Sequence, residues 1–306
     1  MSGDSILPYL WMLGGAVAFA TMGALAHALG VTCDWQIVAV ARTALALVFA
    51  VVLTLAAGSR LVLWHPRTLW LRSIAGSISL VCTFYALPRM PVAEVLTVTN
   101  VFPVWVALLS WPVLGEVPTR ETWVAIALGL SGVVLVVSQQ PDVPSAQLGA
   151  AVLPASYVGL PAAAALLASF TTAIAMLGLH RLQAIDPRAI VAHFSGVALT
   201  VCLLALVLVP NHAVEHSHFD SRTLWMLLAV GVCATIGQLF LTKAFAAGPP
   251  AKVSVVALTQ IVFAVLFDAL VWGRSFQALT VVGMLLVMAP TAWLLLRQEQ
   301  PEASDL

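Results

Sequence analysis

Charged side chains are scarce in this chain of 306 residues. Asp, Glu, Lys and Arg together make up 8% of it, whereas hydrophobic residues make up 61%. Soluble globular domains carry about a quarter charged residues, and a soluble fold could not hide this much apolar surface. The composition therefore excludes an ordinary soluble domain and predicts an integral membrane protein. The 13 basic and 13 acidic residues cancel, which removes any electrostatic argument for a nucleic-acid partner.

Several chemical motifs are also absent. The four cysteines, Cys33, Cys82, Cys202 and Cys233, form no C-x-x-C pair. Metal or redox chemistry is therefore not indicated, and they are expected to pack as small apolar residues. No Gly-Lys-Ser/Thr phosphate-binding sequence occurs, so direct ATP hydrolysis is not supported and the energy source would be an ion or substrate gradient. No cofactor is expected.

Ten apolar stretches, each about long enough to cross a bilayer, are separated by short polar or Pro-containing breaks. Backbone in lipid must satisfy its hydrogen bonds internally, so all ten are expected to be helices. The first is expected to be a retained helix, because it lacks the basic flank of a signal peptide. The expected spans are residues 7–28, 36–58, 68–88, 92–113, 121–139, 154–180, 187–209, 222–247, 250–272 and 275–296.

A polar segment with two prolines, near residues 138–147, divides these spans into two groups of five. The expected organisation is a first repeat at 1–140, a linker at 141–153, a second repeat at 154–298 and a cytoplasmic tail at 299–306. A shift of 158 positions lays Pro249 on Pro91, Ala251 on Ala93, Val253 on Val95 and Gly273 on Gly115. Because five is odd, the second half must enter the membrane from the opposite side. The expected fold is an all-α membrane protein of two inverted five-helix repeats.

Two segments of the first half carry a recognisable motif. They are Phe84-Tyr85-Ala86-Leu87-Pro88-Arg89-Met90-Pro91-Val92-Ala93-Glu94-Val95 and Leu108-Leu109-Ser110-Trp111-Pro112-Val113-Leu114-Gly115-Glu116. Together they resemble the Y-A-L-x-x-x-P-x-A-E and L-L-S-W-x-x-L-G-E signature of the EamA family, in the drug/metabolite transporter superfamily. The resemblance implies ten helices in two EamA repeats, and transport of amino acids, nucleotide-like metabolites or related compounds, by export as readily as import. The second half has Gly273-Arg274 where a Gly-Glu pair is usual, so the halves are not expected to have identical roles.

Ionisable side chains within spans are costly in lipid and usually face the bundle interior. Arg42, Glu94 and Asp268 all fall in the outer half of the expected bundle. One hypothesis is that Glu94 or Asp268 takes up a proton or a cationic substrate, while Arg42 binds an anionic group or keeps the acid ionised. The alternative is a structural Arg–carboxylate pair that locks helices together.

Two further ionisable residues lie at related positions near the inner face. Under the repeat inversion, His193 falls close to the position of Arg42, and Lys252 falls at that of Glu94. Charges on both sides of a central cavity would suit two alternating gates. The alternatives are a Lys252 side chain that extends to the headgroups, and a neutral His193 imidazole bonded to a neighbouring helix.

Uncharged polar and aromatic residues near mid-membrane are the candidates for substrate binding. Asn100 and Gln260 are the strongest, because a buried amide needs several hydrogen-bond partners that a substrate can provide. Trp105 could stack on an aromatic or cationic substrate or simply pack. The remaining candidates are Ser77, Phe84, Thr97, Ser169, Thr172 and Gln238.

The outer loop 212–218 contains three histidines and Glu215. Such a group could bind Zn²⁺, but its spacing matches no recognised zinc motif, and a solvated polar loop is the alternative. No resident metal is assigned.

Basic residues favour one side of the expected topology, which predicts that both termini are cytoplasmic. Arg60, Arg67, Arg72, Arg120, Arg181, Arg188, Lys243, Lys252 and Arg297 fall on or near the inner side, against Arg89, Arg222 and Arg274 outside. The expected function is secondary active transport of a small polar or amphipathic metabolite, amino-acid-like by preference, across the inner or plasma membrane by alternating access. Protons are the candidate coupling ion, and a monomer and a homodimer both remain open. The alternatives are a membrane-embedded enzyme acting on lipids and a sensory membrane subunit.

Overall fold

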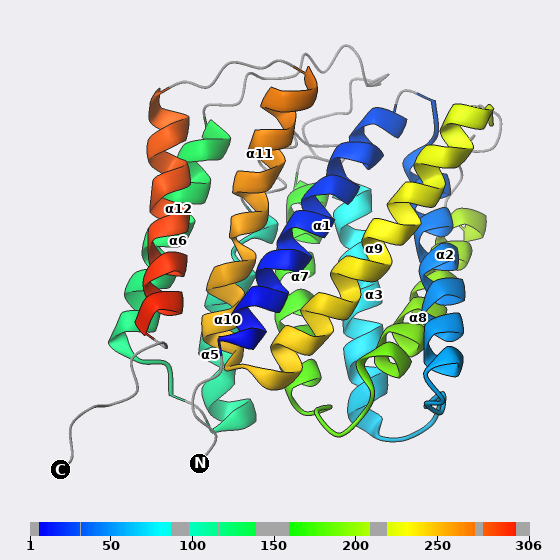
Figure 1. Ribbon diagram of the computed structural model, residues 1–306, viewed down its shortest axis with the longest axis horizontal. Coiled ribbons are helices and arrows are strands. Elements are labelled where there is room, and N and C mark those ends of the chain that lie inside the picture. Colours follow the sequence, from blue (N-terminus) through cyan, green and yellow to red (C-terminus); the bar gives the residue numbers. More distant parts are fainter. Residues whose placement is uncertain are drawn as a thin grey trace.

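A computed structural model describes residues 6–30, 32–86, 98–115, 117–138, 159–208, 219–272 and 278–297. All regular secondary structure in these ranges is helical (Figure 1). The helices are α1 (Leu7–Leu29), α2 (Trp35–Ala56), α3 (Arg67–Ala86), α5 (Phe102–Leu114), α6 (Arg120–Ser138), α7 (Gly159–His180), α8 (Pro187–Leu208), α9 (Ser221–Ala247), α10 (Pro250–Ala257), α11 (Thr259–Trp272) and α12 (Ala278–Arg297).

Six helical segments are long and apolar enough to cross a bilayer. They lie in α1, α2, α3, α7, α8 and α9, and shorter apolar segments lie at Phe102–Leu114, Pro250–Ala264 and Val281–Pro290. Large apolar side chains such as Val52, Val207 and Leu270 are exposed on the bundle surface, where a bilayer would cover them. An all-helical membrane protein is thus confirmed, while the count of ten spans stays a prediction.

Aspartate side chains begin three of the long helices. The carboxylate of Asp34 accepts a hydrogen bond from the backbone N–H of Gln36, and that of Asp186 accepts one from Arg188. Asp220 accepts from Thr223 in the same way at the start of α9. These N-caps satisfy backbone donors that the first turn of a helix leaves free. They fix where α2, α8 and α9 begin.

The expected ninth span is not one continuous helix. It is divided at Leu258 into α10 and α11, and the backbone there makes tight bonds from Leu258 N–H to Val255 O (3.1 Å) and from Ile261 N–H to Leu258 O (3.1 Å). The hydroxyl of Thr259 also donates to Val256 O at 2.7 Å. Such side-chain bonds compete with the regular helical ladder and bend helices.

The expected fourth span contains a matching interruption in its described part. A turn at residues 100–101 precedes α5, with bonds from Val101 N–H to Val98 O (3.2 Å) and from Val104 N–H to Val101 O (3.0 Å). Pro103, in the first turn of α5, has no N–H to continue a helix from before the turn. The acceptors Val98 and Val255 lie 157 positions apart, within one position of the sequence shift that aligns the halves.

Helix packing repeats between the two halves. α1 packs on α9 as α7 packs on α3, and α2 contacts α9 as α8 contacts α3. Contacts of α1 with α11 are matched by contacts of α7 with α5, while α2 pairs with α8 and α6 with α12. Exchanging the halves therefore leaves this set of helix pairs unchanged.

The loops after α2 and after α7 lie at the same end of the bundle, the lower end in Figure 1. The Ser59 hydroxyl after α2 donates to Asp186 Oδ2 after α7 at 2.5 Å. Because α2 is the second helix of its half and α7 the first of the other, α1 and α7 run in opposite directions. The largest buried cluster lies among α1, α3, α7, α9 and α10, with Tyr9, Leu69, Leu179, Phe245 and Val256.

Candidate substrate site

A buried arginine lies between α3, α8 and α9. The side chain of Arg72 is 1% exposed, and its Nη2 donates a hydrogen bond to Oε1 of Gln238 at 3.0 Å. Its Cζ lies 3.9 Å from the centre of the Phe194 ring, a cation–π contact. Its Nε and Nη1 have no hydrogen-bond partner in the described part of the chain. The sequence prediction placed Arg72 at the inner end of its span, and that placement missed its burial inside the bundle.

Glycines on two helices make room for this arginine. A Cβ atom at Gly76 would lie 2.9 Å from Arg72 Nη1 and 2.9 Å from Cε2 of Phe194. A Cβ atom at Gly178, on α7, would lie 3.1 Å from Cβ of Arg72. The spacing of Arg72 and Gly76, one helical turn apart, is the sequence feature that could have indicated a buried guanidinium.

A small hollow lies beside Gln238, among α2, α3, α8 and α9. Its lining consists of Arg42, Thr43, Ala46, Leu80, Phe194, Ser195, Ala234 and Gln238. The centre of a water-sized sphere can occupy about 10 Å³ of it, which is room for about one water molecule. In this structure the hollow has room for one small polar group.

Two polar groups that line the hollow make no hydrogen bond within the part of the chain that the structure describes. The Oγ atom of Ser195 is buried and makes no hydrogen bond within the described residues. Arg42, which is half-buried, makes neither a hydrogen bond nor an ion pair with any described residue. Buried polar groups are nearly always hydrogen-bonded. These two are therefore the groups best placed to meet a substrate.

A second hollow continues along the same helices. It is lined by Trp35, Gln36, Ala39, Leu80, Val81, Cys202 and Ala205. It shares Leu80 with the first hollow, and its residues precede those of the first on α2 and follow them on α8. The Trp35 ring stacks on Phe84 with centroids 6.2 Å apart. This second hollow is mainly apolar, although Oε1 of Gln36 is buried there without a hydrogen-bond partner in the described part.

His193 is bonded on both sides of its ring. Nδ1 lies 2.8 Å from the Ser73 hydroxyl and Nε2 lies 3.2 Å from Leu63 O. A carbonyl can only accept, so Nε2 carries a proton and Nδ1 can accept from Ser73. Trp70 contacts the imidazole edge to face at 4.7 Å. The geometry is that of a histidine that joins α8 to α3, and a gating role stays a prediction.

Other predicted site residues make hydrogen bonds away from the hollow. The indole N–H of Trp105 donates to Ser169 Oγ at 3.0 Å, and its ring contacts Phe170 edge to face. Thr172 shares a 2.6 Å hydrogen bond with Ser79. The Ser77 hydroxyl donates to the backbone oxygen of Ser73. The Trp105 and Thr172 contacts join α5 and α3 to α7, whereas the Ser77 bond lies within α3.

The remaining candidates lie near the helix interruptions or outside the described residues. Asn100 is in the turn before α5, while Gln260 and Lys252 are half-buried on α11 and α10. Asp268 belongs to α11, but its side chain is outside the described part, as are Glu94, Thr97 and the loop 212–218. Of the predicted residues whose side chains the structure describes, only Arg42 and Gln238 line the hollow itself.

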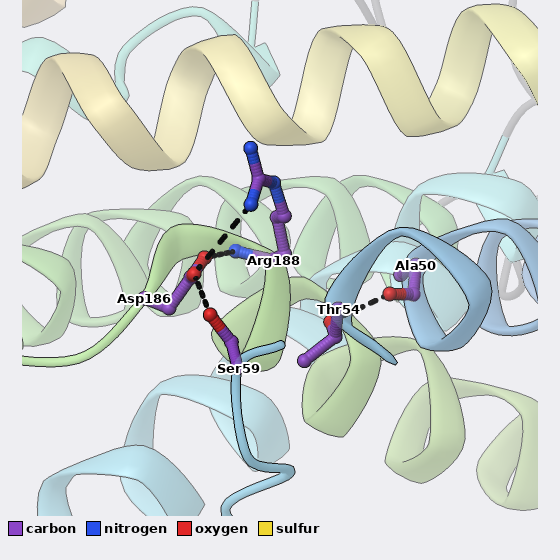
Figure 2. Close-up of polar contacts among 5 residues, drawn as sticks. All are labelled: Ala50, Thr54, Ser59, Asp186 and Arg188. Carbon is purple, nitrogen blue, oxygen red and sulfur yellow. Dashed lines mark hydrogen bonds and ion pairs between the residues drawn. The ribbon is translucent and has the colours of Figure 1, made fainter. Parts of the chain in front are cut away.

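Polar contacts close one end of the bundle. The carboxylate of Asp186 accepts from Ser59 and lies 3.8 Å from Nη1 of Arg188, as Figure 2 shows. In the same view the Thr54 hydroxyl donates to Ala50 O at 2.6 Å, so its proton is not available to another residue. Arg181 donates to Val113 O at the end of α5, and His180 Nδ1 lies 3.2 Å from Phe245 O of α9.

The contacts of Asp186 stabilise its charged form. Partial burial alone would raise its pKa, but hydrogen bonds from Ser59 and from the Arg188 N–H oppose this. The positive charges of Arg188 and Lys243 act in the same direction, and the pKa of Asp186 lies below its usual value. The carboxylate is therefore ionised at neutral pH and holds the two loops together.

Comparison with known proteins places the chain among transporters. The EamA-like transporter family matches residues 6–138 and 159–296. The chain is similar to the pseudopaline exporter CntI of Pseudomonas aeruginosa, with 28% identity over 88% of this chain and 89% of the exporter. It is also similar to the probable transport protein YPL264C of Saccharomyces cerevisiae, with 25% identity over 76% and 69% of the two chains. A crystal structure with 18% identity superimposes with a TM-score of 0.79 over 96% of this chain and 99% of that one, which shows the shared fold.

Proposed function

Because this chain belongs to the EamA-like transporter family, and is a membrane transporter rather than an enzyme, we propose that it carries a small polar or amphipathic metabolite by alternating access. The substrate would bind among α2, α3, α8 and α9. The observation that carries this proposal is a pair of polar side chains, without partners among the described residues, that line one hollow between helices. Ser195 and Arg42 line a common hollow with Gln238 and lack protein partners in the described part of the chain.

The arrangement of the two halves supports alternating access. Carriers of this kind place their substrate between inverted repeats, next to helices that are interrupted near mid-membrane. The opposed directions of α1 and α7, the exchangeable helix pairs and the matched interruptions near Val101 and Leu258 agree with two inverted five-helix repeats. The Ser59–Asp186 contact would then belong to a state closed at that end, which we assign to the cytoplasmic side with both termini.

The names of relatives support export of an organic solute. CntI of Pseudomonas aeruginosa is named for pseudopaline export. We propose outward transport across the inner or plasma membrane, with an amino-acid-like substrate and a gradient as the energy source.

We assign proton coupling to two acidic residues. Glu94 and Asp268 are the acidic residues that lie more than one position inside the expected spans, and a buried carboxylate with a raised pKa can take up a proton near neutral pH. An Asp268→Asn variant should lose the response of flux to a proton gradient. Unchanged gradient dependence in this variant would remove Asp268 from the coupling step.

A pair of matched variants tests the position of the site. Purified protein in proteoliposomes would be assayed for counterflow of amino acids, nucleosides, vitamins and organic cations. Gln238→Leu should abolish counterflow of the accepted solute. Gln260→Leu makes the same chemical change on α11 and should keep counterflow. Normal flux with Gln238→Leu and lost flux with Gln260→Leu would move the site to the helix interruption. Absence of counterflow for every solute would contradict the proposed function.

A further inference from the structure

We infer that the hollow between Arg42 and Gln238 is a carboxylate-binding site, and that the transported solute is a carboxylate with an apolar remainder. This inference rests on the proposed function and specifies the substrate class of that site. Arg42, Gln238 and Ser195 would contact the carboxylate. Arg72 would act through Gln238 and is a positioning residue.

The first argument is the orientation of the Gln238 amide. A guanidinium has only N–H donors, so the amide group that faces Arg72 Nη2 at 3.0 Å must be the oxygen. The amide NH₂ of Gln238 is consequently left for other partners, and Gln238 lines the hollow. Arg72 thus makes Gln238 a hydrogen-bond donor toward the bound solute.

The second argument is the balance of donors and acceptors in the hollow. Arg42 contributes N–H donors alone, and the hydroxyl proton of Ser195 has no protein acceptor in the described part. The hydroxyl of Thr43 already donates to Ala39 O at 2.9 Å. A solute with two acceptor oxygens satisfies this set better than an amine would. Arginine binds carboxylates through paired, charge-assisted hydrogen bonds.

The third argument is the charge of the four surrounding helices. α2 and α3 contribute Arg42 and Arg72, and the sequences of α2, α3, α8 and α9 contain no Asp or Glu. Cations inside a membrane protein normally pair with anions or carbonyl groups. Within the described residues neither guanidinium forms an ion pair. An anionic solute would supply the missing charge.

The second hollow defines the remainder of the solute. It shares Leu80 with the first hollow, is lined by earlier residues of α2 and later residues of α8, and is mostly apolar, including the ring of Trp35. A carboxylate bound at Arg42 would extend its aromatic or aliphatic part into this space. Polar dicarboxylates would leave a second charge there without a partner.

The test compares carboxylates with their carboxamides. The probes are 3-phenylpropanoate, indole-3-acetate and L-phenylalanine, each with its amide, and binding is measured by thermal stabilisation of the purified full-length protein. We expect at least one acid to bind and its amide to bind about 30-fold more weakly or worse, because the amide leaves a buried charge unpaired. Arg42→Gln should weaken binding of the acid to a similar degree and abolish the preference. Arg222→Gln, which removes an exposed charge at the start of α9, is the matched control and should bind as the wild type does.

Proteoliposome counterflow separates this inference from the proposed function. Binding and flux of the acids with loss of both in Arg42→Gln would support the carboxylate site. Equal binding of acid and amide, binding unaffected by Arg42→Gln, or no binding by any of the acids would overturn it. If a cation or nucleoside moves instead, the transport proposal stands without the carboxylate site. If no solute moves, both fail.

Discussion

The Nη2 atom of Arg72 on α3 donates a hydrogen bond to Oε1 of Gln238 on α9 at 3.0 Å. The two residues are 166 positions apart, and the bond is buried. One partner is charged and the other neutral, so their removal has unequal consequences. Deleting the neutral partner leaves a buried charge without its acceptor, whereas deleting the arginine removes the charge itself.

Replacement of Gln238 by Leu should destabilise the protein more than replacement of Arg72 by Met. We expect Gln238→Leu to lower the free energy of unfolding by about 1–3 kcal/mol, because the guanidinium loses its acceptor. Arg72→Met should be close to neutral, since replacing a buried charge by an apolar group of similar volume is often tolerated. The measurement is reversible unfolding in mixed micelles. The double variant should be more stable than Gln238→Leu alone, and equal stability of the two would contradict this account of the pair.

Only part of this site could be predicted from the sequence. The scarcity of charge and the ten apolar stretches predicted a helical membrane protein, and the motif from Phe84 to Glu116 indicated the family. Arg42 and Gln238 were recognisable because polar side chains within apolar stretches attract attention. Arg72 was missed, because it lies close to a helix end, where a basic residue usually extends to the headgroups. Its partner lies 166 positions away, and no local pattern identifies such a pair.

The interruption at Leu258 could not be predicted for a related reason. No proline or glycine occurs between Ala251 and Trp272, so the stretch looked like one continuous helix. The break depends on bonds such as that from Thr259 to Val256 O, and threonine hydroxyls also occur within unbroken helices of this chain, as at Thr43. Packing between helices decides which of them bends.

A methyl group added at Gly76 should disturb the buried arginine. The new Cβ would lie 2.9 Å from both Arg72 Nη1 and Phe194 Cε2, closer than van der Waals contact allows. Overpacking of this kind costs about 1–3 kcal/mol, and Gly76→Ala should also weaken solute binding by displacing Arg72 from Gln238. Gly23→Ala on α1 is the control, since its Cβ would meet nothing within 4 Å. Similar unfolding midpoints for the two variants would show that the Arg72 pocket is not tightly packed.

The loop contact of Asp186 should make a pH-dependent contribution to stability. Its pKa is lower in the folded protein than its usual value, so the contribution is fully present above about pH 4 and is lost as the pH falls through the lowered pKa. At neutral pH Asp186→Asn should be less stable than the wild type by up to about 1 kcal/mol, the size of partly exposed ion pairs. The difference in unfolding midpoint should be constant from pH 6 to 8 and shrink below pH 4. A difference that grows on acidification would have the wrong sign.

Fixing the two loops together should stop transport. Ser59 follows α2 and Asp186 precedes α8, and their side chains meet at 2.5 Å, so we expect opening of this end to separate them. We would replace Cys33, Cys82, Cys202 and Cys233 by alanine, introduce Ser59→Cys with Asp186→Cys, and join the thiols with a short cleavable bis-thiosulfonate. Counterflow should fall at least tenfold on cross-linking, because alternating access requires both ends to open in turn, and it should recover when the link is reduced. The single-cysteine variants are the controls and should keep their flux after the same treatment. Undiminished flux through the cross-linked protein would mean that this end stays closed throughout the cycle, or that the two loops move as one unit.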